Sequence, residues 1–212
     1  MNRYVKEALL AYGPAFVAPA LWGVVNYPDR LRWTGDVSAQ VFSLLAGIYD
    51  GWTGVEGYGE PLEQALMDLR SEPTHVLDIA TGTGYVARRI KERYPSAEVV
   101  GIDVSSEMVA VAEENAGEEG LDIEFRTGDA ADLPFPADTF DLVVMQNALP
   151  FVDEMLRVTG PRGRSLLVYS VAGPWVSLIW PSIASSFEKA GAAHLRTRRV
   201  AYGFFALARK RG

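Results

Sequence analysis

The sequence predicts an α/β protein with a doubly wound, mostly parallel sheet of about seven strands. An antiparallel hairpin ends the chain, and an N-terminal helical cap precedes the sheet. Three observations support this fold. Strand-like and helix-like runs alternate from about residue 70, a glycine loop at Thr81–Gly84 joins the first strand to the first helix, and two β-like runs close the chain with only Tyr202-Gly203 between them.

The expected elements follow from local patterning. Strands are expected at residues 74–79, 98–103, 123–127, 140–145 and 165–170, followed by the hairpin runs 194–201 and 204–209. The run 140–145 is apolar on both faces, which is typical of a buried parallel strand. Helices are expected at residues 85–93, at about 105–116 with Ser105 as N-cap, at 152–158 and at about 175–190.

The length of 212 residues favours one domain. We expect residues 1–70 to form a helical cap segment that belongs to the same domain as the core, residues 71–212. The uncharged run from Ala8 to Pro28 resembles a membrane segment, but Pro14 and Pro19 interrupt it. We therefore expect cap helices over an apolar pocket, with no membrane span and a cytoplasmic location.

Composition excludes several classes of function. There are no cysteines, which excludes disulfides, thiolate nucleophiles and cysteine zinc sites. His75 and His194 are the only histidines and lie far apart in sequence, so no metal site is expected. The net charge of −7 would repel a phosphate backbone, so we expect a small-molecule substrate and no nucleic acid. The sequence leaves the oligomeric state open.

The glycine loop indicates a nucleotide-class site. Gly82 and Gly84 allow a tight turn and a close approach of the backbone to a ligand. By themselves these glycines, with Ala87 and Asp103, also fit the loose dinucleotide fingerprint of nicotinamide enzymes. The loop alone does not distinguish the two ligands.

Three features favour S-adenosylmethionine. Asp78 lies just before the loop, where a carboxylate would repel a pyrophosphate and attract the ammonium group of an amino acid. Asp103 and Asp129 each follow a predicted strand, so that Asp103 can accept from ribose hydroxyls and Asp129, with Ala130, can meet the adenine edge. No Tyr-x-x-x-Lys pair of the kind used in hydride transfer is present.

At these residues the chain resembles the class I S-adenosylmethionine-dependent methyltransferases, in the branch of ubiquinone/menaquinone-biosynthesis and small-molecule enzymes. The similarity extends over roughly residues 48–209. The segments that carry it are 77–84 as the first motif, with alanine at its first glycine position, 100–105 as the ribose strand, 128–130 with 133–135 as the adenine motif, 140–144 as the fourth strand, 160–163 as the turn before the fifth, and the Tyr49-Asp50 pair.

The resemblance implies a Rossmann-like fold, methyl transfer from S-adenosylmethionine with S-adenosylhomocysteine as product, and a set of cofactor-binding residues. That set is Asp78, Ala80, Thr81, Gly82, Gly84, Asp103, Val104, Met108, Asp129, Ala130 and Gln146. Structural roles remain open at some of these positions, with Asp78 as a loop N-cap, Gly84 as a packing glycine and Asp103 as a helix cap.

The acceptor side departs from the family pattern. Only residues 146–164 connect the fourth and fifth strands, where the family usually carries a longer segment that roofs the acceptor pocket. We expect acceptor contacts from Tyr49, Tyr58, Gln146, Asn147 and Phe151, and a small apolar or aromatic substrate. A protein that binds the cofactor without methyl transfer and, with less support, a nicotinamide oxidoreductase are the alternatives.

Overall fold

The computed structural model describes residues 56–148, 150–170 and 176–212. Most of the expected cap, including Tyr49, lies outside these residues. The described strands are β1 His75–Ile79, β2 Glu98–Asp103, β3 Glu124–Thr127, β4 Phe140–Gln146, β5 Thr159–Tyr169, β6 Ala192–Val200 and β7 Gly203–Lys210. The described helices are α4 Glu60–Met67, α5 Tyr85–Arg93, α6 Ser106–Glu118, α7 Val152–Val158 and α8 Val176–Lys189.

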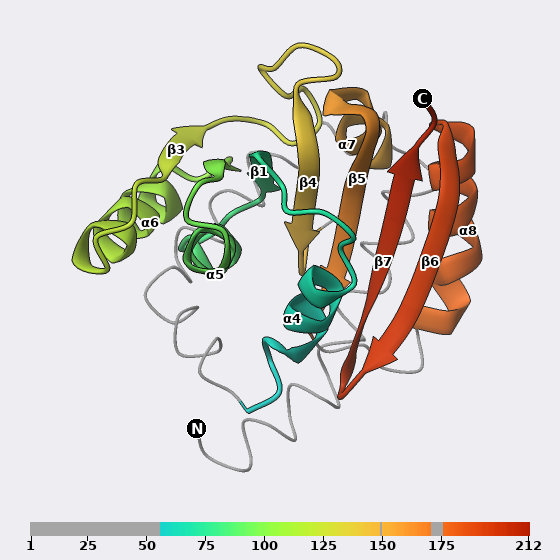
Figure 1. Cartoon of the computed structure of the whole chain (residues 1–212), viewed down its shortest axis with the longest axis horizontal. Coiled ribbons are helices and arrows are strands. Elements are labelled where there is room, and N and C mark those ends of the chain that lie inside the picture. The colour runs from blue at the N-terminus through green and yellow to red at the C-terminus, as the bar shows by residue number, and fades with distance from the viewer. Residues whose placement is uncertain (1–55, 149, 171–175) are drawn as a thin grey trace.

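The strands form one sheet of seven in the order β3-β2-β1-β4-β5-β7-β6 (Figure 1). Neighbours from β3 to β5 are parallel, and β7 runs antiparallel to both β5 and β6. The chain moves outward from β1 to β3 and then returns to β4 on the other side of β1. Because connections leave β1 and β4 in opposite directions, a crevice is expected at their carboxyl ends. The predicted doubly wound sheet with its terminal hairpin is confirmed.

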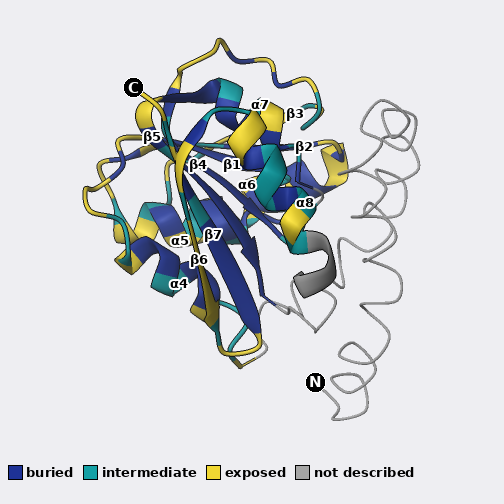
Figure 2. Ribbon diagram, turned by 90° about the vertical axis from the view of Figure 1, so that its right-hand side faces the viewer, coloured by how far each residue is buried: buried dark blue, intermediate teal, exposed yellow. Residues whose placement is uncertain are grey.

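Helices cover both faces of the sheet. One buried cluster joins α4, α5 and α6 to side chains such as Val76 and Val144. The other joins α7 and α8 to Leu77 and Ile79 from the same strand β1. Successive residues of β1 therefore alternate between two cores, as the pleat requires. Figure 2 shows the inner strands of the sheet as buried, whereas much of β6 is exposed.

The segment before the fifth parallel strand differs from the expectation of a separate turn at residues 160–163. Strand β5 begins at Thr159, and its pairing with β4 shifts register between Phe140 and Leu142. Arg162 lies at φ 64° within this irregular stretch. A Cβ at Gly163 would stand 2.8 Å from the carbonyl oxygen of Gly160, so the backbone folds closely on itself there. The expected turn is thus a bulge within a longer strand.

The hairpin turn is also displaced by one residue. It consists of Ala201 and Tyr202, because Gly203 already pairs with Val200. Ala201 adopts φ 50°, which is uncommon for a residue with a side chain. Gly203 is closely surrounded, since a Cβ there would lie 2.2 Å from the carbonyl oxygen of Tyr169. The absence of a side chain therefore allows β7 to start beside the end of β5.

Strand β6 is the outer edge of the sheet and most of its residues are exposed. Arg196 and Arg198 extend toward α4, where Asp68 lies 3.0 and 3.7 Å from their guanidinium nitrogens. Arg199 is exposed as well. Within the described part of the chain, none of the helices has the length and apolar character needed to cross a bilayer.

Candidate cofactor and acceptor site

The residues predicted to bind ligand gather at the carboxyl edge of the parallel strands. Asp78 lies in β1, Asp103 ends β2, Asp129 follows β3 and Gln146 ends β4. The register pairs Asp78 with Gly101 on one side and with Val144 on the other. The sheet therefore brings these side chains to one rim, with the crevice between β1 and β4 among them.

The glycine loop turns sharply between β1 and α5. Ala80, Gly82 and Gly84 all have positive φ, at 54°, 55° and 82°. A Cβ at Gly84 would lie 3.1 Å from Ala112 and from the ring of Phe125. Both the backbone angle and the close packing therefore require glycine at position 84. The expected structural role of Gly84 in packing is confirmed, and its position at the start of α5 also leaves helix N–H groups at the rim.

Asp78 is completely buried beneath this loop. Its Oδ2 accepts hydrogen bonds from the Thr81 hydroxyl at 2.6 Å and from the Ala87 amide at 3.1 Å. Burial raises the pKa of the carboxyl group from 3.8 to about 7, with these two hydrogen bonds opposing the shift. The expected alternative of a loop-capping aspartate is thus present in the structure. Oδ1 is buried and has no partner among the described residues, so one acceptor remains available.

Asp103 fastens the glycine loop to the end of β2. Its Oδ2 accepts from the Gly82 amide at 2.9 Å and its Oδ1 from the Ser105 amide at 3.0 Å. Only 8% of the residue is exposed, and burial raises the pKa of its carboxyl group. Each carboxylate oxygen has two lone pairs, so the group can accept from ligand hydroxyls without releasing the loop. Ser105 caps α6 by accepting from the Met108 amide, as predicted.

The remaining expected cofactor residues differ in exposure. Asp129 is exposed, and its Oδ1 accepts from the Ala131 amide at 2.8 Å. Ala130 is half-buried against the core, and Val104 has 37% of its surface exposed beside Asp103. Met108 lies in α6 and is 2% exposed, so its side chain is part of the buried core.

A polar cluster joins the ends of β4 and β5. The Asn147 Oδ1 accepts from the Ser170 amide, and its Nδ2 donates to the hydroxyls of Ser170 and Tyr58 at 3.2 and 3.0 Å. The Gln146 Nε2 donates to the same Ser170 hydroxyl at 2.9 Å, while its Oε1 is buried without a partner in the described chain. In either orientation of its amide, Gln146 keeps one polar atom for a ligand. We call these four residues the acceptor cluster.

Backbone conformation and a ring contact fix two members of this cluster. Asn147 has φ 54°, a left-handed conformation that asparagine adopts more readily than most residues. Tyr58 comes from the segment before α4 and packs edge-on against Tyr85 at 5.4 Å, so it brings the preceding segment to the rim. Phe151 is half-buried against the core near the start of α7. Ser170 was not among the expected site residues, although it is the last residue of the predicted strand 165–170 and directly follows the observed strand β5.

These observations fit an adenosyl amino-acid ligand. The site offers unpaired buried acceptors at Asp78 and Gln146, a carboxylate at Asp103 with spare lone pairs, and a glycine loop whose backbone is open to close approach. Acceptors of this kind match an ammonium group and a pair of ribose hydroxyls. The carboxyl groups of Asp78 and Asp103 carry negative charge when they are ionised, which is unfavourable for a pyrophosphate.

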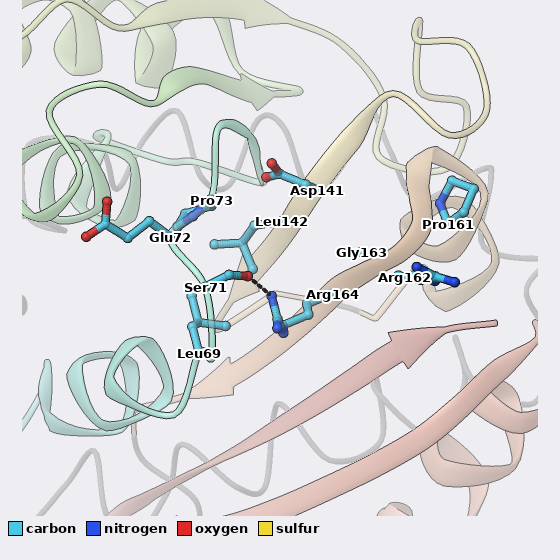
Figure 3. A pocket seen from close by; sticks show the side chains of 10 residues that line it. All are labelled: Leu69, Ser71, Glu72, Pro73, Asp141, Leu142, Pro161, Arg162, Gly163 and Arg164. Carbon is cyan, nitrogen blue, oxygen red and sulfur yellow. Dashed lines mark hydrogen bonds between the residues drawn. The ribbon is translucent and has the colours of Figure 1, made fainter. Parts of the chain in front are cut away.

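A hollow of about 130 Å³ lies at the opposite edge of the sheet (Figure 3). It is lined by the segment before β1, the start of β4 and the first part of β5, and two of its polar side chains have hydrogen-bond partners. Arg164 donates to the Ser71 hydroxyl at 3.0 Å, and Asp141 accepts from the Thr74 amide at 2.8 Å. His75 starts β1 at this same edge and pairs with Glu98 at 3.5 Å, so it lies away from the proposed chemistry. Across the described ranges, no group of three or more histidine, aspartate or glutamate side chains could hold a metal ion.

The fold and the rim together define a Rossmann-like nucleotide-binding protein with an antiparallel terminal strand pair. Comparison with known proteins narrows this class. Residues 76–163 match a family described as "Methyltransferase domain". This range contains the glycine loop, Asp103 and Asp129, together with Gln146 and Asn147 of the acceptor cluster.

Curated relatives carry methyltransferase names. The chain is 38% identical over 139 residues to a demethylmenaquinone methyltransferase of Thermus thermophilus, covering 60% of this chain and 63% of the relative. It is 41% identical over 145 residues to a protein of the same name from Deinococcus radiodurans, covering 63% of this chain and 60% of the relative. The chain therefore spans about three fifths of the length of these relatives.

Solved structures share the fold. A SAM-dependent methyltransferase from Aquifex aeolicus has a TM-score of 0.56 and 23% identity, and the match covers 72% of this chain and 90% of that structure. These matches support a class I S-adenosylmethionine-dependent methyltransferase core similar to that of the demethylmenaquinone enzymes. The resemblance predicted from the sequence motifs is confirmed.

Proposed function

We propose that this protein binds S-adenosylmethionine at the carboxyl rim and transfers its methyl group to a small, apolar or aromatic molecule. The observation that carries the proposal is Asp103, whose carboxylate holds the glycine loop through Gly82 while keeping lone pairs for ribose hydroxyls. A ligand that bound Asp103 would lie directly beside the loop. The relatives' family supplies the matching cofactor.

The cofactor-binding roles follow the order of the strands. Gly82 and Gly84, with Ala80 and Thr81, form the loop that approaches the amino-acid end, and Asp78 supports it from below. Asp103 and Val104 would meet the ribose, and Asp129 with Ala130 the adenine. Met108 contributes by packing beneath this region, since it is buried inside α6.

The chemistry requires chiefly alignment and exclusion of water. The bound sulfonium supplies an electrophilic methyl group, and an acceptor held in line with the carbon–sulfur bond can react by direct displacement. The acceptor cluster is suited to orienting such a molecule. Tyr58 accepts from Asn147 and so keeps its own proton for a ligand oxygen, while Gln146 keeps an amide atom. Phe151 and, from outside the described residues, Tyr49 would supply apolar contacts.

The names of the relatives support a quinone-like acceptor, because both relatives described above are named demethylmenaquinone methyltransferase. An aromatic ring bearing oxygen substituents would match the apolar and polar parts of the rim. We propose that residues 1–70 form the cap over this acceptor and that residues 71–212 form the cofactor-binding core. Nucleic acid is not proposed as a substrate because of the net charge of −7.

The experiment has two stages. Mass spectrometry of the ligand retained on the purified full chain, with calorimetry of S-adenosylhomocysteine, tests cofactor binding. Release of S-adenosylhomocysteine is then measured with hydroquinones, phenols and polar or macromolecular acceptors under anaerobic conditions. Turnover with the aromatic acceptors supports the proposal. Binding without turnover across the whole panel would favour the non-catalytic alternative, and reduced-nicotinamide fluorescence on mixing would favour the oxidoreductase.

A further inference from the structure

The loop between β3 and β4 is held by two charged side chains of α7. Arg157 donates from Nη1 to the Phe135 carbonyl at 2.8 Å and from Nη2 to the Leu133 carbonyl at 2.9 Å. Glu154 accepts from the Leu133 amide at 2.8 Å. Two side chains thus bind three backbone groups in a segment that has no regular secondary structure of its own.

The two side chains are also joined to each other. Nε and Nη2 of Arg157 donate to the two carboxylate oxygens of Glu154 at 2.6 and 2.7 Å, which is the bidentate arrangement. Glu154 is 19% and Arg157 36% exposed at the side chain, so the pair is partly shielded from water. The hydrogen bonds from Arg157 lower the pKa of the Glu154 carboxyl group, which keeps it ionised as an acceptor.

Buried side chains make the held segment rigid. Leu133 and Phe135 are 4% and 9% exposed in the core shared with α7. The Phe135 ring packs edge-on against Phe140, with 5.1 Å between the ring centroids. The Arg126 guanidinium carbon lies 5.4 Å from the centroid of the same Phe135 ring. The loop is therefore fixed at residues 133–135 by its backbone and its side chains together.

The fixed segment lies only a few residues from the proposed adenine contacts. The Asp132 amide donates to the Asp129 carbonyl at 3.1 Å, so residues 129–132 form a tight turn that leads directly into Leu133. At the other end, the Gly128 amide donates to the Asp103 carbonyl at 2.8 Å. The turn that contains Asp129 and Ala130 is therefore anchored at one end by Asp103 and at the other by the Glu154–Arg157 pair.

We propose that Glu154 and Arg157 are positioning residues that hold the Asp129–Ala130 turn in place against the adenine ring of the cofactor. They act through the loop and do not touch the ligand themselves. The inference rests on the proposed function, because it takes the adenine to lie beside this turn. According to this proposal, the ion pair on α7 contributes to recognition of the adenine base by holding the loop that contacts it.

The test compares ligands that differ only in the base. Binding of S-adenosylhomocysteine and of its inosine counterpart, S-inosylhomocysteine, is measured by calorimetry on the full chain. We expect Arg157→Gln and Glu154→Gln to weaken S-adenosylhomocysteine binding by about tenfold. In these variants only a fraction of the molecules would hold the Asp129–Ala130 turn in the binding-competent conformation, which lowers the apparent affinity. The preference for adenine over hypoxanthine should fall as well, and hydrogen exchange at residues 129–135 should accelerate.

Two further variants separate positioning from stability. The exchange variant Glu154→Arg/Arg157→Glu keeps an ion pair on α7 but reverses the groups that face the loop, so it should not restore base preference. Arg89→Gln on α5 disrupts ion pairs with Glu63 on α4 and Glu92 on α5, and it should leave the binding of both ligands unaffected. Arg157→Lys retains the charge and provides a milder change should the glutamine variant fold poorly.

The outcomes are distinct. Unchanged affinity and base preference in the folded Arg157 variants, or full recovery in the exchange variant, would overturn the positioning role. Failure of the wild-type chain to bind S-adenosylhomocysteine at all would instead refute the proposed function, which this experiment reports separately.

Discussion

Replacing Asp103 by alanine tests the central contact of the proposed site. The change removes the acceptors of the Gly82 and Ser105 amides, at 2.9 and 3.0 Å, together with the acceptors proposed for the ribose. Hydrogen bonds to charged groups contribute about 1.5 to 3 kcal/mol each. Losing the ribose contacts should therefore weaken binding by at least roughly tenfold, since each 1.4 kcal/mol is about a factor of ten.

The measurement is calorimetric affinity for S-adenosylhomocysteine, with thermal unfolding of the free protein recorded beside it. Asp103→Asn is the second variant, because it keeps one acceptor oxygen and most of the volume. Asp122→Ala, an exposed carboxylate ahead of β3 at the opposite edge, is the matched control and should bind normally. If folded Asp103→Ala binds the ligand as tightly as the wild type, the placement of the ribose is wrong.

Three further predictions concern the loop and the acceptor cluster. Burial raises the pKa of Asp78 to about 7, so between about pH 4 and pH 7 the folded state retains a proton that the unfolded state loses. The free energy of unfolding should therefore fall as the pH rises through this range. Thermal unfolding of Asp78→Asn should lack this decline. Gly84→Ala should destabilise by about 1 to 3 kcal/mol in denaturant titrations, given its φ of 82°, whereas equal stability would disprove the requirement for glycine. Tyr58→Phe should raise KM for an oxygen-bearing aromatic acceptor by about tenfold without changing cofactor affinity, and a change confined to the cofactor would contradict its acceptor role.

The sequence predicted the sheet well because buried strands and their ends carry local signals. Runs of apolar residues predict the strands, and glycine or proline indicates the ends of several strands and helices. The bulge at residues 160–163 could not be predicted in this way, because it depends on the register between β5 and β4. The sequence offers the structural role of Asp78 as an alternative, because a carboxylate before a glycine loop can accept hydrogen bonds from nearby amide and hydroxyl groups.

The side-chain networks were less predictable. Ser170 contacts Asn147 because β4 and β5 are neighbours in the sheet. The sequence around either residue does not predict this contact. Glu154 and Arg157 have the spacing of an ordinary helix ion pair, and their bonds to Leu133 and Phe135 depend on the path of an irregular loop. Tyr49 lies outside the described residues, so its contact with the ligand stays a prediction.

The arginines of β6 affect whether another strand can pair with this edge of the sheet. An additional strand from a second copy, laid antiparallel on β6, would bring its own Arg196, Arg198 and Arg199 close to the same three side chains. Like charges facing one another across paired strands are destabilising. Such pairing would also desolvate Arg199 and disturb the ion pairs of Arg196 and Arg198 with Asp68. We therefore expect the charges along β6 to oppose the addition of a strand from a second copy at this edge.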